Sequence, residues 1–259
     1  MATAAKLLTQ TLPSRRYLIP EWPAPANVLA VASKRDLAIP DEDPMAGFNV
    51  ARHVSDDLHR VAGHRQQLCA DLQLSQEPAW LNQVHGTKVV SLPLLKSALV
   101  DADASFSEQN GQTCVVMTAD CLPVLFCDRQ GTRVAAAHAG WRGLAGGVLE
   151  NTLALFPDPS DVIAWLGPAI GPDAFEVGED VKQAFVAQSP QAISCFVSRP
   201  NAPGKYLADL YALARLRLQY CGVGGIYGGQ ECTFSQQQDY FSHRRNANSG
   251  RQLSLISLL

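Results

Sequence analysis

The sequence lacks any apolar run approaching the roughly 18 residues needed to cross a bilayer. No continuous apolar segment follows Met1–Lys6, as a signal peptide would require. The seven cysteines are an odd number and include no Cys-x-x-Cys spacing. That usage argues against a disulfide framework and favours a reducing compartment. These absences predict a cytoplasmic protein.

An excess of basic charge is also missing. The 21 Lys and Arg residues face 24 Asp and Glu residues, which gives a formal net charge of −3. Domains that bind nucleic acid usually carry a basic patch or stripe, whereas here the basic residues are scattered apart from Arg15-Arg16 and Arg244-Arg245. We therefore expect a small-molecule substrate, and neither nucleic acid nor a membrane as a partner.

Hydrophobic periodicity predicts an α/β protein. A length of 259 residues with 47% hydrophobic composition is sufficient for a large core. The predicted strands are Asn27–Ser33, Ala79–Val84, Thr113–Met117, Cys121–Cys127, Thr132–His138, Val162–Leu166, Gly225–Tyr227 and Gln252–Leu258. The predicted helices are Leu58–Leu72, Leu144–Phe156, Glu179–Ala187 and Asp209–Cys221. Residues 1–25 are predicted to be a loosely ordered lead-in, and residues 26–259 a single domain.

The predicted hairpin around residues 128–131 brings a cysteine and a histidine together. With a four-residue turn there, Cys127 pairs with Thr132, and Cys121 then lies opposite His138 on the same face. Their Cβ atoms would be about 4.5–5.5 Å apart. A thiol and an imidazole at that separation can share a metal ion or form a nucleophile and its base. A slip of one residue would place them on opposite faces.

A metal site with an open position needs a third protein ligand. Among the six histidines, His85 is the best candidate because it ends a predicted strand and Gly86 leaves room beside it. The other histidines, in or near the first helix or in the polar C-terminal segment, are His53, His59, His64 and His243. A purely structural role for His85 and His138, with Cys121 as a small buried hydrophobe, remains the alternative.

Three aspartates lie near these candidates in the sequence. Asp120 adjoins Cys121 and could orient a ligating imidazole, or it could simply form a turn between two strands. Asp101 and Asp103 could orient ligands in the same way, although a solvated turn is the preferred interpretation of that segment. Asp120 and Glu176 are the candidates for a general acid.

Several arginines are candidates for binding an anionic substrate group. Arg142 follows His138 at the start of a predicted helix, where backbone N–H groups also point outward. Arg35, Arg244 and Arg245 could bind phosphate as well, and an ordinary surface position is the preferred interpretation for each taken alone. Asn49 and Glu176 complete the set of predicted substrate-binding residues.

Several of these segments together resemble the signature of the peptidoglycan-editing or laccase-domain family, the YfiH-like proteins. The resemblance runs from about Leu18 to Leu259. The motifs that carry it are Asn82–Gly86 (NQVHG), Ala102–Ser105, Met117–Val124 (MTADCLPV), Ala137–Gly143 (AHAGWRG), Trp165–Pro172 and Phe175–Gly178. Their number and order make the match specific.

The resemblance implies a fold, a metal and an activity. The fold would be a single α/β domain of mixed β-sheets packed between helices. The metal would be zinc. Its ligands would be His85 of the NQVHG motif, Cys121 of the MTADCLPV motif and His138 of the AHAGWRG motif. The activity would be that of a purine nucleoside phosphorylase acting on adenosine, inosine and methylthioadenosine, with adenosine deaminase activity. Bacterial relatives are also described as removing L-serine from the UDP-muramyl precursor of peptidoglycan.

This sequence departs from the family pattern in two places. Relatives usually carry Thr-Arg-x-Gly-Gly early in the chain, where this sequence has Ser33–Leu37 (SKRDL) and keeps only the arginine, Arg35. Relatives usually carry Phe-Ser-Tyr-Arg-Arg near the C-terminus, where this sequence has Phe241–Arg245 with His243 in place of tyrosine. Both departures bear on the substrate preference and leave the metal ligands unchanged.

Three other classes of function compete with a zinc phosphorylase. Cys121 as nucleophile and His138 as base would suit a hydrolase that cleaves an amide of a muramyl precursor. A laccase-type oxidase would need a copper cluster held mainly by histidines, and six histidines with three far from the site make copper a weaker choice than zinc. A non-enzymatic zinc protein is the third. Metal content and turnover of substrate separate these classes.

Overall fold

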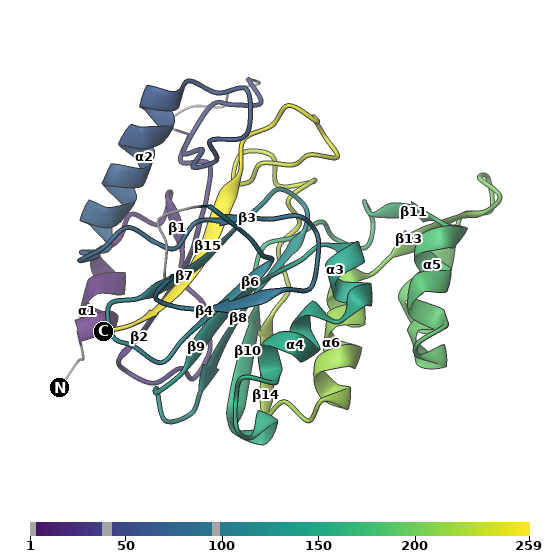
Figure 1. The fold of residues 1–259 in the computed structure, drawn as a ribbon. Helices are drawn as coiled ribbons and strands as arrows, with labels where there is room; N and C mark the ends of the chain where they lie inside the picture. Colours follow the sequence, from purple (N-terminus) through teal and green to yellow (C-terminus); the bar gives the residue numbers. More distant parts are fainter. Residues whose placement is uncertain (1–3, 38–42, 95–98) are drawn as a thin grey trace.

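Two β-sheets pack face to face, and helices cover both outer faces, in the computed structural model (Figure 1). The structure describes residues 4–37, 43–94 and 99–259. One sheet has four strands in the order β1-β2-β15-β7, and the other has six in the order β14-β10-β8-β9-β6-β4. This arrangement confirms the predicted single α/β domain of mixed sheets between helices.

The strands alternate with the helices along the chain without a strict βαβ rhythm. The strands of the four-stranded sheet are β1 (Tyr17–Leu18), β2 (Val28–Ser33), β7 (Thr113–Thr118) and β15 (Gln252–Leu258). Those of the six-stranded sheet are β4 (Val89–Ser91), β6 (Ala104–Ser107), β8 (Leu122–Asp128), β9 (Val134–Ala139), β10 (Val162–Leu166) and β14 (Gly225–Gly228). Two small sheets contain β3 (Leu81–Asn82) with β5 (Val100–Asp101), and β11 (Glu176–Gly178), β12 (Phe196–Ser198) and β13 (Lys205–Ala208).

Six α-helices and two short 3-10 helices lie in the described residues. They are α1 (Ala4–Thr11), α2 (Leu58–Asp71), α3 (Trp141–Gly146), α4 (Val148–Leu153), α5 (Glu179–Val186), α6 (Leu210–Tyr220), η1 (Pro159–Asp161) and η2 (Pro190–Cys195). None of the helices in these residues has the length and apolar character needed to span a membrane. Within residues 4–25, α1 precedes strand β1, which pairs antiparallel with β2; residues 1–3 of the predicted lead-in lie outside the described residues.

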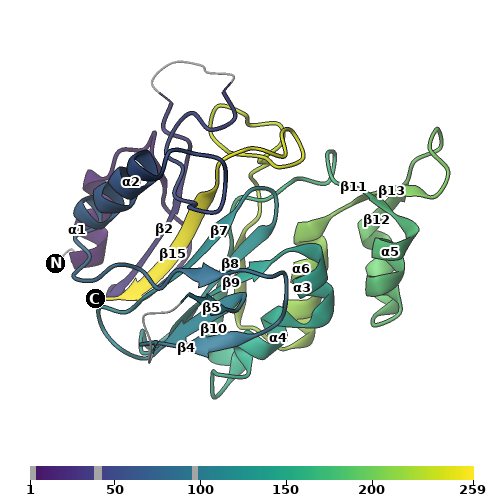
Figure 2. The ribbon, with the colours of Figure 1, turned by 45° about the horizontal axis from the view of Figure 1, so that its top comes forward.

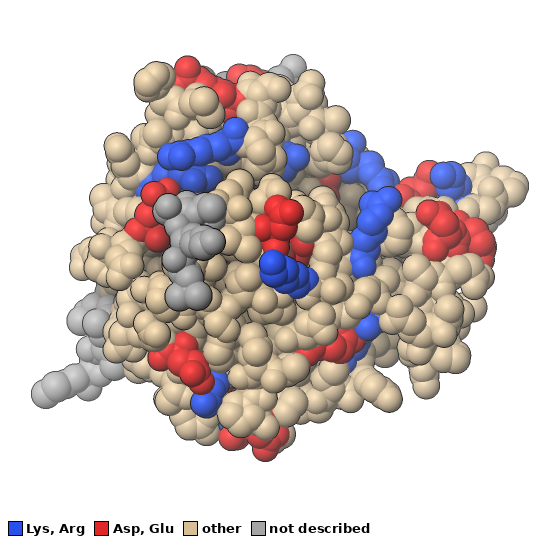
Figure 3. All heavy atoms as spheres, in the orientation of Figure 1, with Lys and Arg blue, Asp and Glu red and all other residues tan. Residues whose placement is uncertain are grey.

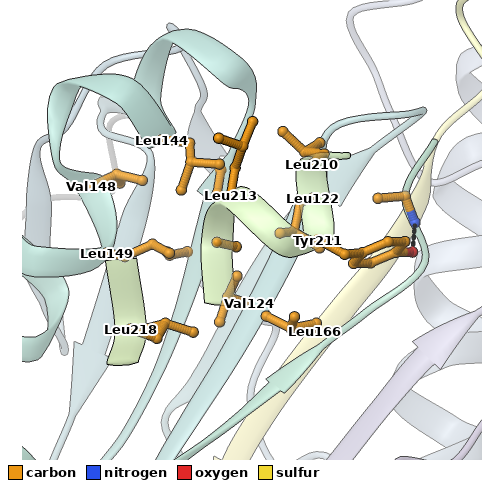
Figure 4. Close-up of a cluster of buried hydrophobic side chains, with 14 of the residues drawn as sticks. Leu122, Val124, Leu144, Val148, Leu149, Leu166, Leu210, Tyr211, Leu213 and Leu218 are labelled. Atoms are coloured by element: carbon orange, nitrogen blue, oxygen red, sulfur yellow. Dashed lines mark hydrogen bonds between the residues drawn. The ribbon is translucent and has the colours of Figure 1, made fainter. Parts of the chain in front are cut away.

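Three hydrophobic clusters hold the layers together. Strands β2 and β15 meet β8 and β9 in a cluster between the two sheets, which includes Ile256 and Leu125. Leu68 of α2 packs on the outer face of the four-stranded sheet. Helices α3, α4 and α6 cover the outer face of the six-stranded sheet (Figures 1 and 2). Figure 4 shows this third cluster, in which leucines of these helices meet Leu122 and Val124 of β8.

The predicted register of the β8–β9 hairpin is wrong, because the four-residue loop begins one residue later than predicted. Pro123, not Cys121, lies opposite His138, and Cys127 pairs with Val134. The cause is the side chain of Asp128, which accepts hydrogen bonds from the backbone N–H groups of Thr132 and Arg133. These bonds keep Asp128 in the ladder and move the four-residue loop to 129–132. The partner of His138 therefore moves by two residues, which preserves the face of the strand.

Two other predicted elements are shorter than expected. The predicted helix over residues 144–156 is broken at Gly147, whose φ of 102° ends α3 and begins α4. The predicted strand over residues 79–84 keeps only Leu81–Asn82, because the chain then turns toward His85, which has a φ of 60°. Both interruptions lie near the candidate site. They let its backbone adopt positive φ angles that a continuous helix or strand does not have.

Candidate metal centre

Three side chains from separate segments converge beside the start of helix α3. The ligand atoms of His85, Cys121 and His138 all lie within 4.8 Å of one another. His138 belongs to β9, Cys121 directly precedes β8, and His85 lies on the turn that follows β3. The sequence predicted the meeting of these residues, although the residue opposite His138 is Pro123, two residues after Cys121.

The turn that carries His85 is fixed to its surroundings by hydrogen bonds. The side-chain amide of Gln83 donates to the carbonyl oxygen of Met117 and accepts from the N–H of Met117, both at 2.8 Å. Nε2 of His85 then lies 3.8 Å from Sγ of Cys121. The rings of His85 and His138 meet edge to face, with centroids 4.8 Å apart. Since Met117 lies in β7, the strand that leads to Cys121, one amide sets the spacing of two candidate ligands.

Asp103 is the carboxylate that orients the cluster. Its side chain is fully buried, and its Oδ1 lies 2.8 Å from Nδ1 of His138 and accepts the N–H of His85 at 2.9 Å. Its Oδ2 accepts the N–H of Gly86 at 2.6 Å and that of Val84 at 3.2 Å. The preferred interpretation of this residue as part of a solvated turn is therefore wrong. The small apolar neighbours on both sides were the sequence feature that pointed to burial.

Asp120 serves a different part of the structure. Its carboxylate accepts hydrogen bonds from the hydroxyls of Thr233 and Ser242 and from the N–H of Arg244. Its φ of 83° turns the chain between β7 and β8. The imidazole-orienting role that the sequence suggested for Asp120 thus belongs to Asp103, while Asp120 holds the C-terminal loop against Cys121.

The electrostatics of the cluster favour a thiolate. Burial opposes ionisation of the Cys121 thiol, but the charge of His138 and hydrogen bonds from His138 and His85 lower the pKa of Cys121. Burial likewise opposes the charged form of His138, but the thiolate and Asp103 raise the pKa of His138. Burial would raise the pKa of Asp103, and its bonds to His138 and to the N–H of Gly86 lower that pKa. Both shifts favour the thiolate form of Cys121 and the protonated form of His138.

The donor set fits a metal ion. Tetrahedral zinc with bonds of about 2.0–2.3 Å places its nitrogen and sulfur ligands roughly 3.3–3.7 Å apart. The 3.8 Å between Nε2 of His85 and Sγ of Cys121 is close to that range. With Nδ1 of His138 bound to Asp103, Nε2 of His138 is left as the ligand atom, which is the usual outer-partner arrangement at metal-binding histidines. Three protein ligands leave one tetrahedral position open.

Gly140 keeps the space at the cluster clear. A Cβ atom at this position would lie 2.9 Å from Sγ of Cys121 and 3.0 Å from Cδ2 of His85. We expect Gly140→Ala to push the ligands apart and to weaken metal affinity by about tenfold or more, a loss comparable to that of an outer partner. Metal titration with a competing chelator measures this, with Gly63→Ala as the control because nothing lies within 4 Å of a Cβ there. Equal affinities for the two variants would contradict the expectation.

The candidate substrate-binding residues Arg142, Arg244 and Glu176 lie toward the surface. Arg142 is exposed at the start of α3, with its guanidinium 4.3 Å from the ring centroid of Trp141. Arg244 is exposed as well and donates from Nη2 to the carbonyl oxygen of Glu176. The carboxylate of Glu176 lies 3.4 Å from Arg199. Arg142 and Arg244 therefore present charge to solvent, and their contact with substrate stays a prediction.

Arg35 and Asn49 lie deeper in the protein. The guanidinium of Arg35 is buried and donates to the backbone carbonyls of Ala46, Gln237 and Asp43. The side chain of Asn49 is fully buried, and its Oδ1 accepts N–H groups of the surrounding loops. Both side chains fix loops near the C-terminal strand, and direct contact with substrate stays a prediction for them.

Comparison with known proteins agrees with the motifs. The family model described as multi-copper polyphenol oxidoreductase laccase matches residues 30–259. The chain belongs to this laccase-domain family. Its curated relatives include proteins named purine nucleoside phosphorylase from Pseudomonas aeruginosa, 49% identical over 93% of this chain and 98% of the relative, and Escherichia coli (YfiH), 47% identical over 94% and 99%.

Solved structures of similar proteins share the fold. A Neisseria meningitidis protein superposes with a TM-score of 0.88 at 48% identity, covering 94% of this chain and 99% of that one. YlmD from Geobacillus stearothermophilus gives a TM-score of 0.85 at 28% identity, with 96% and 98% covered. The resemblance inferred from the motifs is thus confirmed for both family and fold.

Proposed function

We propose that this laccase-domain protein is a zinc-dependent purine nucleoside phosphorylase. The observation that carries the proposal is the converging His85–Cys121–His138 cluster, in a chain close to half identical to relatives named purine nucleoside phosphorylase. Adenosine, inosine and methylthioadenosine are the proposed substrates, with inorganic phosphate as the second substrate. Adenosine deaminase activity is proposed for the same centre.

The donor set supports zinc over copper. Thiolate and imidazole are both ligands that zinc favours, and catalytic zinc sites combine three protein ligands with an open fourth position. Laccase-type copper clusters, by contrast, are built mainly from histidines, and within the described residues this cluster contains two. When bound, zinc would supply Lewis acidity and a place for water or a substrate oxygen at the open position.

The chain's own residues supply orientation around that position. Asp103 holds the ring of His138 so that Nε2 faces Cys121. The turn anchored by Gln83 holds His85. Arg142 lies in the first turn of α3, and the N–H of Arg244 donates to Asp120 beside Cys121. Both side chains are exposed, and we propose that they attract the anionic groups of the substrates.

Phosphate dependence tests the proposed activity. We expect the zinc-loaded protein to release free base from adenosine or inosine only when phosphate is present, with ribose 1-phosphate as the other product. Chromatography of the bases with and without phosphate measures this. Release of serine from UDP-muramyl-L-serine without any base release would instead assign the protein as an editing amidase.

A second candidate function rests on the same geometry. Asp103, His138 and Cys121 form a line of carboxylate, imidazole and thiolate, the order found in enzymes with a cysteine nucleophile. Such a site could cleave an amide of a UDP-muramyl precursor without a metal. Activity that survives removal of the metal would favour this hydrolase, because zinc on the thiolate blocks the nucleophile.

A further inference from the structure

Arg251 approaches the metal cluster from the C-terminal strand. Gln252 is the first residue of β15 and pairs with Thr118 of β7. Continuing that antiparallel register by one residue places Arg251 beside Ala119, two residues before Cys121. The backbone of Arg251 is fixed there, because its N–H donates to Oδ1 of Asn49 at 2.8 Å and its carbonyl oxygen accepts the N–H of Val50 at 3.3 Å.

Among the described residues, the Arg251 guanidinium donates hydrogen bonds from one of its nitrogens, Nη1. Nη1 donates to the carbonyl oxygens of Ser249 at 2.6 Å and Gly250 at 2.9 Å. Nε and Nη2 have no partner among the described residues. Arg245 makes the contrast, since both its Nη1 and its Nη2 donate to backbone carbonyls. The side of the Arg251 guanidinium formed by Nε and Nη2 is therefore left to donate to something else.

The charge of Arg251 has no close counter-ion. In residues 4–37, 43–94 and 99–259, no carboxylate lies within 4.0 Å of this half-buried side chain. Burial lowers the pKa of Arg251, and the negative charges of Cys121 and Asp120, which lie near enough to act, raise it. Cys121 and Asp120 therefore compensate part of the charge of Arg251 from a distance, while Nε and Nη2 remain free of ion pairs within the described residues.

The charge of Arg251 also acts on His53, a residue that lines a neighbouring cavity. Burial and the charges of Arg251 and Arg65 lower the pKa of His53. His53 lines a cavity of about 900 Å³ together with Arg52, Arg65 and Trp80. Figure 3 shows Lys and Arg atoms gathered beside α2, the helix that carries Arg65. The carboxylate of Glu77 also lines this cavity and lies 3.6 Å from the guanidinium of Arg65, so Arg52 is the lining cation that has no ion pair within the described residues.

We propose that Arg251 binds inorganic phosphate beside the His85–Cys121–His138 cluster through Nε and Nη2. Two parallel N–H donors on one side of a guanidinium match two oxygens of a phosphate. The role of that phosphate as the attacking substrate rests on the proposed phosphorylase activity, whereas anion binding by Arg251 does not. The tie from Nη1 to Ser249 and Gly250 holds the guanidinium in place for this contact.

Calorimetric titration of the zinc-loaded protein with inorganic phosphate tests the inference. Arg251→Gln should weaken phosphate binding by about tenfold or more, the usual cost of a lost charge-assisted hydrogen bond. It should raise the KM for phosphate similarly and leave that for inosine nearly unchanged. Arg251→Lys should regain part of the affinity, because an ammonium keeps the charge and loses the fork. Arg129→Gln is the control, since Arg129 is exposed and bound to Gly224 in the hairpin loop.

Each outcome separates the inference from the proposed function. Wild-type phosphate affinity in Arg251→Gln overturns the inference, even if base release is confirmed. Phosphate binding that depends on Arg251 in a protein without base release leaves the inference standing and removes the phosphorylase. If Arg251→Gln loses zinc or its melting temperature collapses, Arg251→Lys decides: phosphate affinity equal to wild type in a zinc-loaded Lys variant overturns recognition by the fork.

Discussion

Cys121→Ala is expected to lose metal and phosphate-dependent base release together while the protein stays folded. The thiolate is one of three ligands, so its removal should cost more metal affinity than the roughly 10- to 100-fold that follows loss of an outer partner. Cys121 precedes β8 and lies outside the three hydrophobic clusters, so the core is untouched. Elemental analysis, melting temperature and base release on one preparation measure the three effects.

A matched cysteine provides the control for this experiment. Cys69 is half-buried on α2, among residues that take no part in the cluster. Cys69→Ala should therefore keep both its metal and its activity. If Cys121→Ala retains full zinc, the ligand assignment is wrong. If the wild-type protein is active without metal and Cys121→Ala is inactive, the cysteine is a nucleophile and the hydrolase replaces the phosphorylase.

Asp103→Ala is expected to destabilise the fold as well as the site. The substitution leaves the N–H groups of Val84, His85 and Gly86 and the Nδ1 of His138 without their acceptor. Removing one partner of a buried charged pair costs about 3–5 kcal/mol, and the N–H groups of the half-exposed turn add less, so we expect the free energy of unfolding to fall by about 3–5 kcal/mol. Metal affinity should fall by roughly 10- to 100-fold as the ring of His138 loses its orientation.

Urea unfolding with and without a chelator separates the two effects of Asp103→Ala, because bound metal adds its own stabilisation. Asp101→Ala is the matched control: the residue lies two positions away, is exposed, and its side chain accepts a hydrogen bond from Asn82. A change within about 0.5 kcal/mol is expected for it. Equal loss of stability in both variants would show that the buried carboxylate is not what anchors the turn.

Local sequence patterns predict a strand accurately where the periodicity of apolar residues is not interrupted. Val162–Leu166 and Gln252–Leu258 have the predicted bounds, because uninterrupted apolar or alternating residues define them. The pairing of strands was beyond such patterns. Strand β15 lies between β2 and β7, two strands far from it in the sequence, and its partners depend on surfaces that form only when the sheets pack.

The site was predictable to the extent that its residues lie in motifs. The motifs identify His85, Cys121 and His138 as candidate ligands, but they do not identify the orienting carboxylate, since burial of Asp103 results from packing of the segments around it. The predicted hairpin register is wrong because the N–H groups of Thr132 and Arg133 donate to the side chain of Asp128. These hydrogen bonds form only in the folded loop, so the sequence pattern does not show them. Arg251 is an ordinary arginine in the sequence, and only the missing counter-ion distinguishes it.

The central place of β15 sets an order on the biogenesis of the protein. Among the strands of the described residues, this segment is translated last, yet it lies between β2 and β7 and follows the loop that brings Arg251 toward the cluster. Until it leaves the ribosome, β2 and β7 each have an open edge that can pair with another chain. The segments that carry the three candidate metal ligands are synthesised before the sheet can be completed, so its open strand edges are exposed to aggregation during that interval.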